Sequence, residues 1–528
     1  MSSLKNRRSG VLMPIFSLPS KYGIGSLGKA AYKFIDFLNK AGQTYWQILP
    51  IEQTGPDNSP YLTYSSRAGN VKFIDIDLLI EDNYITKNDL DECGIKILNT
   101  PEYCKINYKN ITKSRDILFN KVFVKFFENP PSDYNSFCKE NNSWLEDFAL
   151  FMTIKKIQQE KFNNIESTKI QQWPDKFKYR NEKALMELHQ NYSKEVEYFK
   201  MLQYFFFKQW NMLKEYAHKQ GVKIIGDIAY YVSVDSSDAW TNPHIFKIDK
   251  DFTFKTYSGC PPNKSNNKKS KGQVWGSPVY DWEYLKSSNY NWWISRLRDA
   301  LNLYDVIRID HFKGFESYYC IDGKTMDPKT GVYKPGPGLG FWKIAANELN
   351  FKNISDMPIF VEDLGLINQN LKKLIADTGF YGIKVLQFAF NKTNHPEIYK
   401  GQNRLKSSEM YLPHNYPTSS IAYVGTHDND TLMGWINTID KDILQNAKNY
   451  FEENDIHKLF DKMLLSVINS KSNICILCVQ DLLKLNTEGR INVPGTIENN
   501  WTWQLSKNQF NILDPKKLYD LTKKANRL

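Results

Sequence analysis

The sequence predicts an α/β fold, a (β/α)8 TIM barrel with large, mainly helical insertions around its C-terminal face. Eight short apolar or β-branched segments are each bounded by turn residues, and most are followed by amphipathic segments of helical period. Their nearly continuous apolar character is typical of parallel strands covered on both faces, and eight such strands favour a closed barrel over an open sheet. In chain order, the predicted strands are residues 10–18, 44–51, 222–232, 305–312, 358–364, 382–390, 421–426 and 473–481.

The composition is that of a globular protein. Of the 528 residues, 41% are hydrophobic and 24% are charged, which is enough apolar material for a full core and excludes a disordered chain or a small disulfide scaffold. The net charge of +11 is spread along the chain and supports nucleic-acid binding only weakly. We expect residues 1–528 to form a single catalytic barrel domain.

Two long gaps between the predicted strands indicate insertions. Residues 65–215, after the second strand, contain amphipathic stretches at 144–159 and 191–217 and predict a mainly helical insertion. A second insertion is predicted at 233–290, after the third strand. Within it, residues 259–273 are rich in turn formers and lysines and lack an apolar anchor, so we expect a mobile lid loop.

The cysteines and the N-terminus favour a cytoplasmic protein. Seven cysteines form an odd set without regular spacing, which argues against a secreted disulfide framework. Cys475 and Cys478 lie in an apolar run, where a buried strand is a better interpretation than redox or metal chemistry. The N-terminus lacks a signal-peptide cleavage site, and no stretch reaches the roughly 18 apolar residues of a membrane span.

Acidic residues gather at the C-terminal ends of the predicted strands. Asp227, Asp310 and Glu362 each end an apolar run, and Asp428 follows another. Because the active site of such a barrel lies at its C-terminal face, these carboxylates are expected to converge there. The alternative is that each one caps the helix that follows its strand.

Two carboxyl groups about 5 Å apart are what a retaining glycosidase or transglycosylase needs. Arg308 lies two residues before Asp310, on the same strand face, and should lower the pKa of Asp310 and favour an ionised nucleophile. Glu362 has no cation beside it in sequence, and its apolar neighbours together with Asp363 should raise its pKa, as a general acid requires. Asp428 could stabilise positive charge on a sugar ring.

Aromatic and histidine side chains near these carboxylates suggest carbohydrate contacts. Tyr61 and Trp275 could overhang the same mouth and stack on sugar rings, or could simply anchor their loops. His311 and His427 stand next to predicted catalytic residues; they could bond sugar hydroxyls or be structural, and no histidine has the spacing of a metal site. No metal or other cofactor is expected.

A glycine motif offers a competing interpretation. Gly23, Gly25 and Gly28 match the G-x-G-x-x-G fingerprint of dinucleotide-binding proteins, and Glu52 ends the next predicted strand. However, four residues separate the motif from its strand, whereas the fingerprint places its first glycine at the tight turn itself. Pro14 is also awkward in a central parallel strand.

From residue 8 to residue 505, the chain resembles the amylomaltase or disproportionating enzyme family, the 4-α-glucanotransferases of glycoside hydrolase family 77. The motifs that carry the likeness are Gly23-Ile-Gly25-Ser-Leu-Gly28, Ser59-Pro60-Tyr61, Gly226-Asp227-Ile228, Asp235-Ser-Ser-Asp238-Ala-Trp240, Gly272-Gln273-Val-Trp275-Gly276, Arg308-Ile-Asp310-His311-Phe312, Glu362-Asp363-Leu364-Gly365, Gly425-Thr426-His427-Asp428-Asn429-Asp430-Thr431 and Asn492-Val-Pro494-Gly495-Thr496.

The resemblance implies transfer of α-1,4-glucan segments to the 4-hydroxyl of glucose or another glucan by double displacement, with a covalent glycosyl-enzyme. It implies that Asp310 is the nucleophile, Glu362 the general acid/base and Asp428 the transition-state stabiliser. The implied partners are malto-oligosaccharides and α-1,4-glucans, with glucose as an acceptor and without nucleic acid or membrane; the oligomeric state is left open. The sugar contacts that it implies are Ser59, Tyr61, Asp227, Gln273, Trp275, Arg308, His311, His427 and Asn492.

The chain departs from the family pattern at several positions. Asn263, Lys264 and Ser265 replace Asp-Tyr-Phe in the lid, Leu62 replaces a glutamine, and Ala229-Tyr230 replaces Pro-Ile. A lid without these aromatic residues would exclude water less well and shift the balance from transfer towards hydrolysis. The alternatives are therefore an α-glucan hydrolase of the same fold, a glucan-binding protein with little turnover, and, from the glycine motif, a nucleotide-dependent oxidoreductase.

Overall fold

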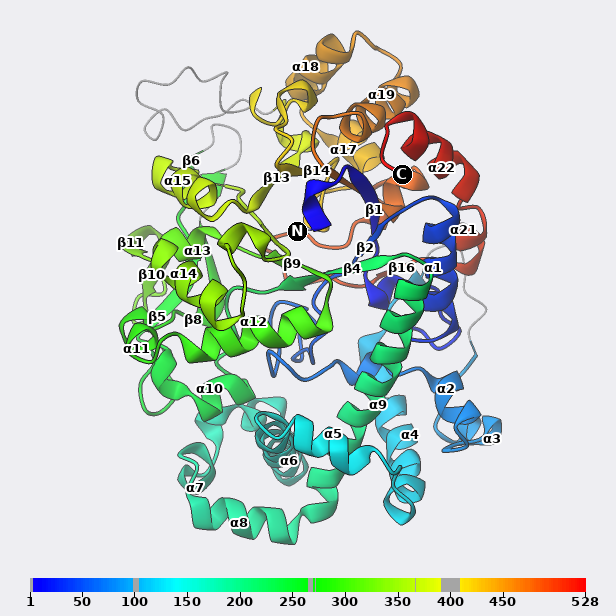
Figure 1. Cartoon of the computed structure of the whole chain (residues 1–528). Helices are drawn as coiled ribbons and strands as arrows, with labels where there is room; N and C mark the ends of the chain where they lie inside the picture. Colours follow the sequence, from blue (N-terminus) through cyan, green and yellow to red (C-terminus); the bar gives the residue numbers. More distant parts are fainter. Residues whose placement is uncertain (1–2, 98–103, 265–268, 271, 366, 391–408) are drawn as a thin grey trace.

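The computed structural model describes residues 3–97, 104–264, 269–270, 272–365, 367–390 and 409–528. In this part of the chain, eight parallel strands close a barrel in chain order, with β1 pairing both β2 and β15 (Figure 1). The predicted (β/α)8 barrel is confirmed. Its strands are β1 (Arg8–Leu12), β2 (Tyr45–Gln47), β4 (Lys223–Ile228), β9 (Val306–Ile309), β12 (Ile359–Val361), β13 (Tyr381–Val385), β14 (Ser420–Tyr423) and β15 (Ile474–Cys478).

The strands are shorter than the apolar runs that predict them. After β1, the chain forms a short 3-10 helix, η2 (Ile15–Ser17), and η9 (Leu386–Phe388) follows β13 in the same way. Both segments are buried, and Met13 and Leu18 are fully excluded from solvent. The apolar runs therefore extend beyond the strands, because the segments that follow β1 and β13 are also buried and need apolar side chains.

Helices cover the outside of the barrel. In α1, the buried side chains Phe34, Ile35 and Leu38 recur at helical spacing and face the strands. The helix α15 is capped at its start by Asn368, whose side chain accepts from the Leu371 amide, and at its end by Gly379 with φ 70°. The helices around the barrel are α1 (Lys29–Lys40), α12 (Asn291–Leu303), α14 (Gly338–Glu348), α15 (Gln369–Thr378), α17 (Leu432–Thr438), α18 (Lys441–Phe451), α19 (Ile456–Ile468), α20 (Val479–Leu482), α21 (Lys507–Asn511) and α22 (Pro515–Lys524).

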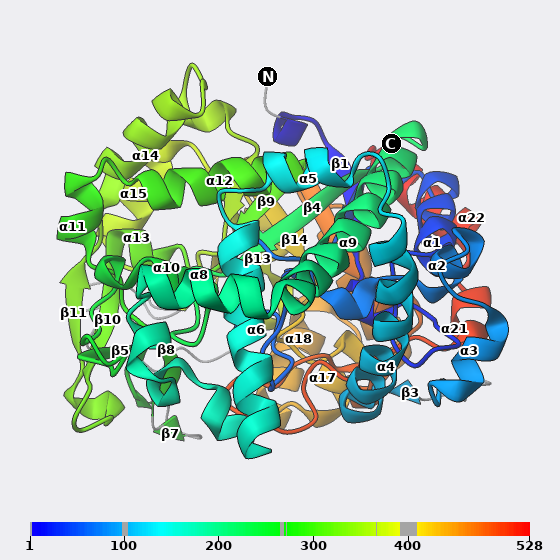
Figure 2. The ribbon, with the colours of Figure 1, turned by 90° about the horizontal axis from the view of Figure 1, so that it is seen from below.

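The chain between β2 and β4 is mainly helical. Figures 1 and 2 show α4 to α9 gathered on one side of the barrel, and the long α9 leads back into β4. The predicted amphipathic stretches at 144–159 and 191–217 correspond to α6 and α9. The helices are α2 (Ile76–Glu81), α3 (Lys87–Glu92), α4 (Tyr108–Glu128), α5 (Tyr134–Glu140), α6 (Leu145–Phe162), α7 (Asp175–Lys178), α8 (Glu182–Asn191) and α9 (Ser193–Lys219), and β3 (Cys104–Lys105) pairs with β16 (Trp503–Gln504).

A small antiparallel sheet stands beside the barrel mouth, in the order β11-β10-β5-β8. Its strands are β5 (Thr256–Cys260), β8 (Gln273–Pro278), β10 (Ser317–Asp322) and β11 (Val332–Pro335), accompanied by α10 (Ser237–Thr241), α11 (Trp282–Ser287) and α13 (Lys313–Glu316). Within the predicted lid loop, β6 (Asn263–Lys264) and β7 (Lys269–Ser270) pair as a hairpin. Residues 265–268 and 271 of this loop lie outside the described residues, so the prediction of a mobile lid stays a prediction.

Two further predictions concern cysteines and membranes. Cys475 and Cys478 lie in β15 with buried side chains, which confirms the buried-strand interpretation. The six cysteines whose side chains the structure describes are free. Among the described helices, none combines the length and the apolar character required to cross a bilayer.

Candidate active site

A cavity of about 470 Å³ opens at the C-terminal ends of the barrel strands. Asp310 follows the last residue of β9 and Glu362 the last residue of β12, while Asp428 lies in the loop after β14. Nine of the twelve predicted site residues line this cavity: Ser59, Tyr61, Gln273, Trp275, Asp310, His311, Glu362, Asp428 and Asn492. The other three lie in the layer beneath it.

The buried guanidinium of Arg308 connects the acidic side chains. Its Nη1 lies 2.5 Å from Asp227 Oδ2, and its Nη2 lies 3.0 Å from Asp310 Oδ1 and 3.9 Å from Glu362 Oε2. The oxygens of Asp310 and Glu362 are therefore at most about 7 Å apart, a range that includes the roughly 5 Å typical of retaining enzymes. One fixed cation thus contacts three carboxylates: Asp227 lies within β4, and Asp310 and Glu362 directly follow β9 and β12.

Burial governs the pKa values of the two central carboxyls. Desolvation raises the pKa of Asp310 well above its usual value, with Arg308 opposing the increase and the charge of Glu362 adding to it. The sequence-based prediction of a lowered pKa for Asp310 is therefore wrong, because loss of solvation outweighs the ion pair. Burial also raises the pKa of Glu362, as predicted, but the prediction that no cation lies beside it is wrong, since Arg308 reaches both groups.

Glu362 is held by the backbone of the neighbouring turn. The amide of His311 donates a 2.8 Å hydrogen bond to Glu362 Oε2. The backbone of His311 has φ 45°, in the left-handed region that non-glycine residues seldom adopt. The turn after β9 therefore carries Asp310 and also orients its partner carboxyl.

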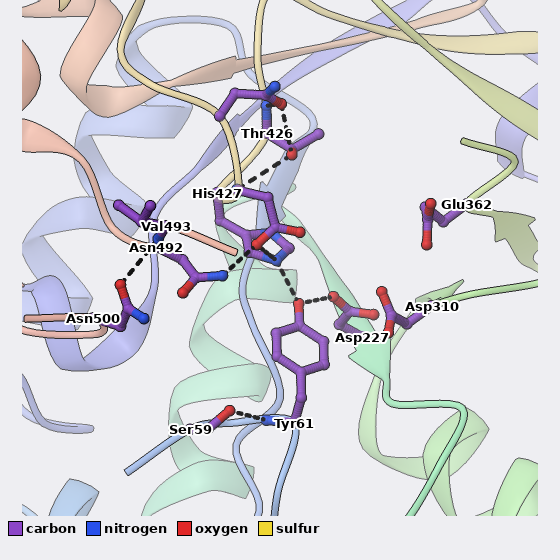
Figure 3. A network of polar contacts seen from close by, with 12 residues as sticks. Ser59, Tyr61, Asp227, Asp310, Glu362, Thr426, His427, Asn492, Val493 and Asn500 are labelled. Atoms are coloured by element: carbon purple, nitrogen blue, oxygen red, sulfur yellow. Dashed lines mark hydrogen bonds and ion pairs between the residues drawn. The ribbon is translucent and has the colours of Figure 1, made fainter. Parts of the chain in front are cut away.

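Tyr61 connects the cavity to the buried layer (Figure 3). Its hydroxyl donates to Asp227 Oδ2 at 2.8 Å and lies 2.9 Å from His427 Nε2. The single proton of this hydroxyl is used in the hydrogen bond to Asp227. The tyrosine oxygen is therefore the acceptor towards His427, whose Nε2 carries a proton and donates it in that hydrogen bond. Burial lowers the pKa of His427, which keeps the ring neutral. Asp227 is fully buried, so it reaches the cavity through Tyr61 and Arg308.

Asp428 is the most exposed of the three predicted catalytic groups, with 42% of its side chain accessible. Asn492 Nδ2 donates to its Oδ1 at 2.7 Å, and His427 Nε2 lies 3.3 Å from the same oxygen. Arg490 donates to the backbone carbonyls of Asp428 and Asn492. The loop after β14 is therefore fixed to the segment after β15, which points a carboxylate into the cavity.

Aromatic rings form one wall of the cavity. Trp275 on β8 lies edge-on to His311, with 4.8 Å between ring centroids, and its Nε1 donates to Gln273 Oε1 at 2.8 Å. Tyr61 and Trp275 line the same cavity, as the sequence predicts. An aromatic wall with amide and hydroxyl groups at its edge is suited to the flat C–H faces and the rim hydroxyls of a sugar.

The glycine motif has a structural explanation. A Cβ at Gly25 would meet the Ile15 carbonyl oxygen at 1.9 Å, and one at Gly28 would meet the Asp75 carboxylate at 2.0 Å. A carboxylate beside Gly28 repels a phosphate, so this turn does not favour a dinucleotide. Among the described residues, no cluster of three or more His, Cys, Asp or Glu side chains is arranged to hold a metal ion.

Comparison with known proteins identifies the family. The family model described as 4-alpha-glucanotransferase matches residues 13–509. The chain belongs to the 4-alpha-glucanotransferase family. It is 39% identical to the 4-alpha-glucanotransferase of Clostridium butyricum, over 97% of this chain and 99% of that protein. It is also 39% identical to the one from Streptococcus pneumoniae serotype 4, over 98% and 97% of the two chains.

Solved structures of the family agree with this assignment. An amylomaltase from Streptococcus agalactiae, in complex with acarbose, superposes with a TM-score of 0.89 at 36% identity, covering 99% of both chains. A Corynebacterium glutamicum amylomaltase, at 20% identity and a TM-score of 0.75 over 99% of this chain and 75% of that one, shows the shared fold. As a member of this 4-alpha-glucanotransferase family, the chain is a transglycosylase.

The cavity also contains residues that the sequence does not single out. Trp501 lines it with φ 61° and packs against both Tyr61 and His427, at 5.8 and 6.1 Å between ring centroids. Ile497 is a further lining residue and is 90% exposed, and Leu62, already noted in the sequence as a departure from the family pattern, also lines the cavity. Trp501 lies nine positions after Asn492 and outside the motif of residues 492–496, so no motif in the sequence indicates its role.

Proposed function

We propose that this chain transfers α-1,4-glucan segments from a malto-oligosaccharide donor to the 4-hydroxyl of glucose or another glucan by a retaining double displacement. One observation carries the proposal: Asp310 and Glu362 line one cavity, share the cation of Arg308, and face a third carboxylate, Asp428. This is the set of groups that such a reaction requires.

The two carboxyls titrate as a pair, since each is buried and repels the other. Burial raises the pKa of both carboxyls, so the pair retains one proton over a wide pH range. Of the two states that hold one proton, Arg308 favours the one with Asp310 ionised and Glu362 protonated, because it lies closer to Asp310. The His311 amide occupies Glu362 Oε2, so the other oxygen of that carboxyl holds the proton and gives it to the leaving group.

In the first step, the carboxylate of Asp310 attacks the anomeric carbon while the glycosidic C–O bond breaks and Glu362 protonates the departing oxygen. In the second step, Glu362 takes the proton of the acceptor 4-hydroxyl, whose oxygen attacks the same carbon and releases Asp310. Asp428 stabilises the positive charge that develops on the ring in both steps. Two inversions retain the α configuration, and no group beyond these side chains is needed.

The surrounding residues have supporting roles in this proposal. Trp275 and Tyr61 stack on sugar rings, and Ser59, Gln273, His311 and Asn492 bond sugar hydroxyls. Asp227, Arg308 and His427 lie beneath the cavity floor, where they hold Tyr61 and Asp310 in place. We propose further that residues 1–528 act as one catalytic domain with insertions at 65–215 and 233–290, of which the second contributes Gln273, Trp275 and Ser277 to the cavity wall. We also propose that the protein is cytoplasmic, which the free cysteines support.

The test is incubation of the purified protein with maltotriose alone. Transfer yields glucose and a ladder of longer oligomers with a constant number of reducing ends. A rising number of reducing ends would instead indicate a hydrolase, and affinity without turnover would indicate a glucan-binding protein. The substitutions Asp310→Asn and Glu362→Gln should each remove nearly all transfer with the fold intact, and wild-type activity in either would refute the assigned roles.

A further inference from the structure

The turn of residues 310–314, directly after β9, contains backbone geometry that its surroundings must maintain. His311 has φ 45°, in the left-handed region that few non-glycine residues adopt, although histidine adopts it more often than most. Such a conformation persists only where neighbouring contacts fix it. This turn carries the carboxyl of Asp310, and through the His311 amide it also bonds Glu362.

The contacts on the barrel side of this turn are backbone groups. The Asp310 amide donates to Ile228 O at 3.0 Å, and the Phe312 amide donates to Glu362 O at 3.2 Å. Within the turn, the Gly314 amide donates to His311 O at 3.0 Å. These bonds fix the entry to the turn. Its far end runs into α13, where the Phe315 amide donates to Phe312 O at 3.0 Å and Gly314 O accepts from a side chain.

Tyr230 holds that far end. Its hydroxyl donates a 2.8 Å hydrogen bond to Gly314 O, and its side chain is 99% buried. The ring lies edge-on to His311 and to Phe315, with 5.9 and 5.1 Å between centroids. A Cβ on Gly314 would lie 2.4 Å from the tip of the Tyr230 ring, so only glycine permits this approach.

We propose that Tyr230 is a positioning residue for the transfer reaction. Its hydroxyl fixes the end of the 310–314 turn, and through the strained His311 backbone it sets the relative placement of Asp310 and Glu362. The proposal rests on the function proposed above.

The same cluster offers a matched control. Tyr280 is also fully buried, and its hydroxyl donates to a backbone carbonyl, Tyr230 O, at 2.7 Å. Tyr280→Phe therefore removes one buried O–H···O=C bond from the same aromatic cluster, as Tyr230→Phe does, but it leaves the bond to Gly314 in place. If Tyr230 contributed to packing and stability alone, the two substitutions would have the same effect on catalysis.

The experiment measures kcat and KM for glucose release from maltotriose in the whole protein, with near-ultraviolet circular dichroism to establish folding at the assay temperature. For Tyr230→Phe we expect kcat to fall about tenfold with a smaller change in KM, because the turn aligns the reacting groups. The substitution keeps the Tyr230 ring that lines the cavity, and His311 is the one proposed sugar contact that the turn carries. For Tyr280→Phe we expect kcat within twofold of wild type.

A second variant approaches the same contact from the turn. Gly314→Ala pushes a methyl group into the Tyr230 ring and should also lower kcat with a smaller change in KM. An active wild type with unchanged kcat in both Tyr230→Phe and Gly314→Ala refutes this proposal alone, as does an equal loss of kcat in Tyr280→Phe. A wild type without transfer refutes the proposed function instead.

Discussion

Arg308→Lys tests whether one guanidinium must serve several carboxylates at once. The guanidinium of Arg308 contacts Asp227 through Nη1 and Asp310 through Nη2, and both contacts are charge-assisted. Lysine keeps the charge but has a single nitrogen on a flexible stem, so it cannot hold both positions. Because Asp227 is fully buried, leaving it unpaired is the costlier alternative, and the ammonium should stay with Asp227 at the expense of Asp310.

The size of the effect follows from the strength of the bond between Arg308 and Asp310. A hydrogen bond to a charged group contributes roughly 1.5–3 kcal/mol. If the transition state loses all of this free energy, kcat/KM falls about ten- to 150-fold, at 1.36 kcal/mol for each factor of ten. Without its ion pair, the already raised pKa of Asp310 rises further, so the acidic limb of the pH–rate profile should move to higher pH.

The assay is the initial rate of glucose release from maltotriose across the pH range, alongside thermal unfolding. Arg527→Lys is the matched control. Arg527 is fully buried and donates to backbone carbonyls such as Ile468 O and Ser472 O, next to the start of β15 at the opposite end of the barrel. The substitution Arg527→Lys should lower the melting temperature while leaving kcat within twofold of wild type. Arg308→Lys with wild-type kcat/KM and an unmoved acidic limb would refute the reasoning.

Core packing, a buried acid and metal independence give three further predictions. Gly226→Ala should lower stability by about 1–3 kcal/mol in denaturant titration, because its Cβ would lie 2.2 Å from the buried Tyr304 ring; an unchanged midpoint would contradict this. Burial raises the pKa of Asp481 to about 7, so between about pH 4 and that value the folded state holds a proton that the unfolded state has released, and rising pH costs stability. Asp481→Asn should therefore gain in melting temperature relative to wild type as the pH rises through this window, and a constant difference would argue against the buried acid. EDTA should leave transfer unchanged, whereas loss of activity that zinc or calcium restores would require a metal in the mechanism.

Much of the architecture could be predicted because burial leaves a clear pattern. The runs at β4, β9 and β12 are mainly apolar and each has a carboxylate at or near its C-terminal end. This pattern predicts both the barrel and the convergence of Asp227, Asp310 and Glu362. Strand ends are harder to predict, because η2 and η9 are as buried as the strands they follow. An apolar run indicates that a segment is buried, but it does not indicate whether the backbone of that segment pairs with a neighbouring strand.

The electrostatics of the site could not be predicted from neighbours in sequence. Arg308 is two residues from Asp310 and far from Glu362 along the chain, yet its Nη2 reaches both. Desolvation, which dominates both pKa values, depends on segments far apart in the chain that line one cavity. Trp501 and Tyr230 escape prediction for a similar reason, since their contacts are with turns from other strands.

The most direct test traps the intermediate on the Glu362→Gln variant. Fluoride leaves without an acid, so α-maltosyl fluoride should glycosylate this variant, which then lacks the base that activates an acceptor. Peptide mass spectrometry should locate one maltosyl group on the peptide that contains Asp310. A label on another carboxylate, or none under conditions where fluoride is released, would contradict a double displacement through Asp310.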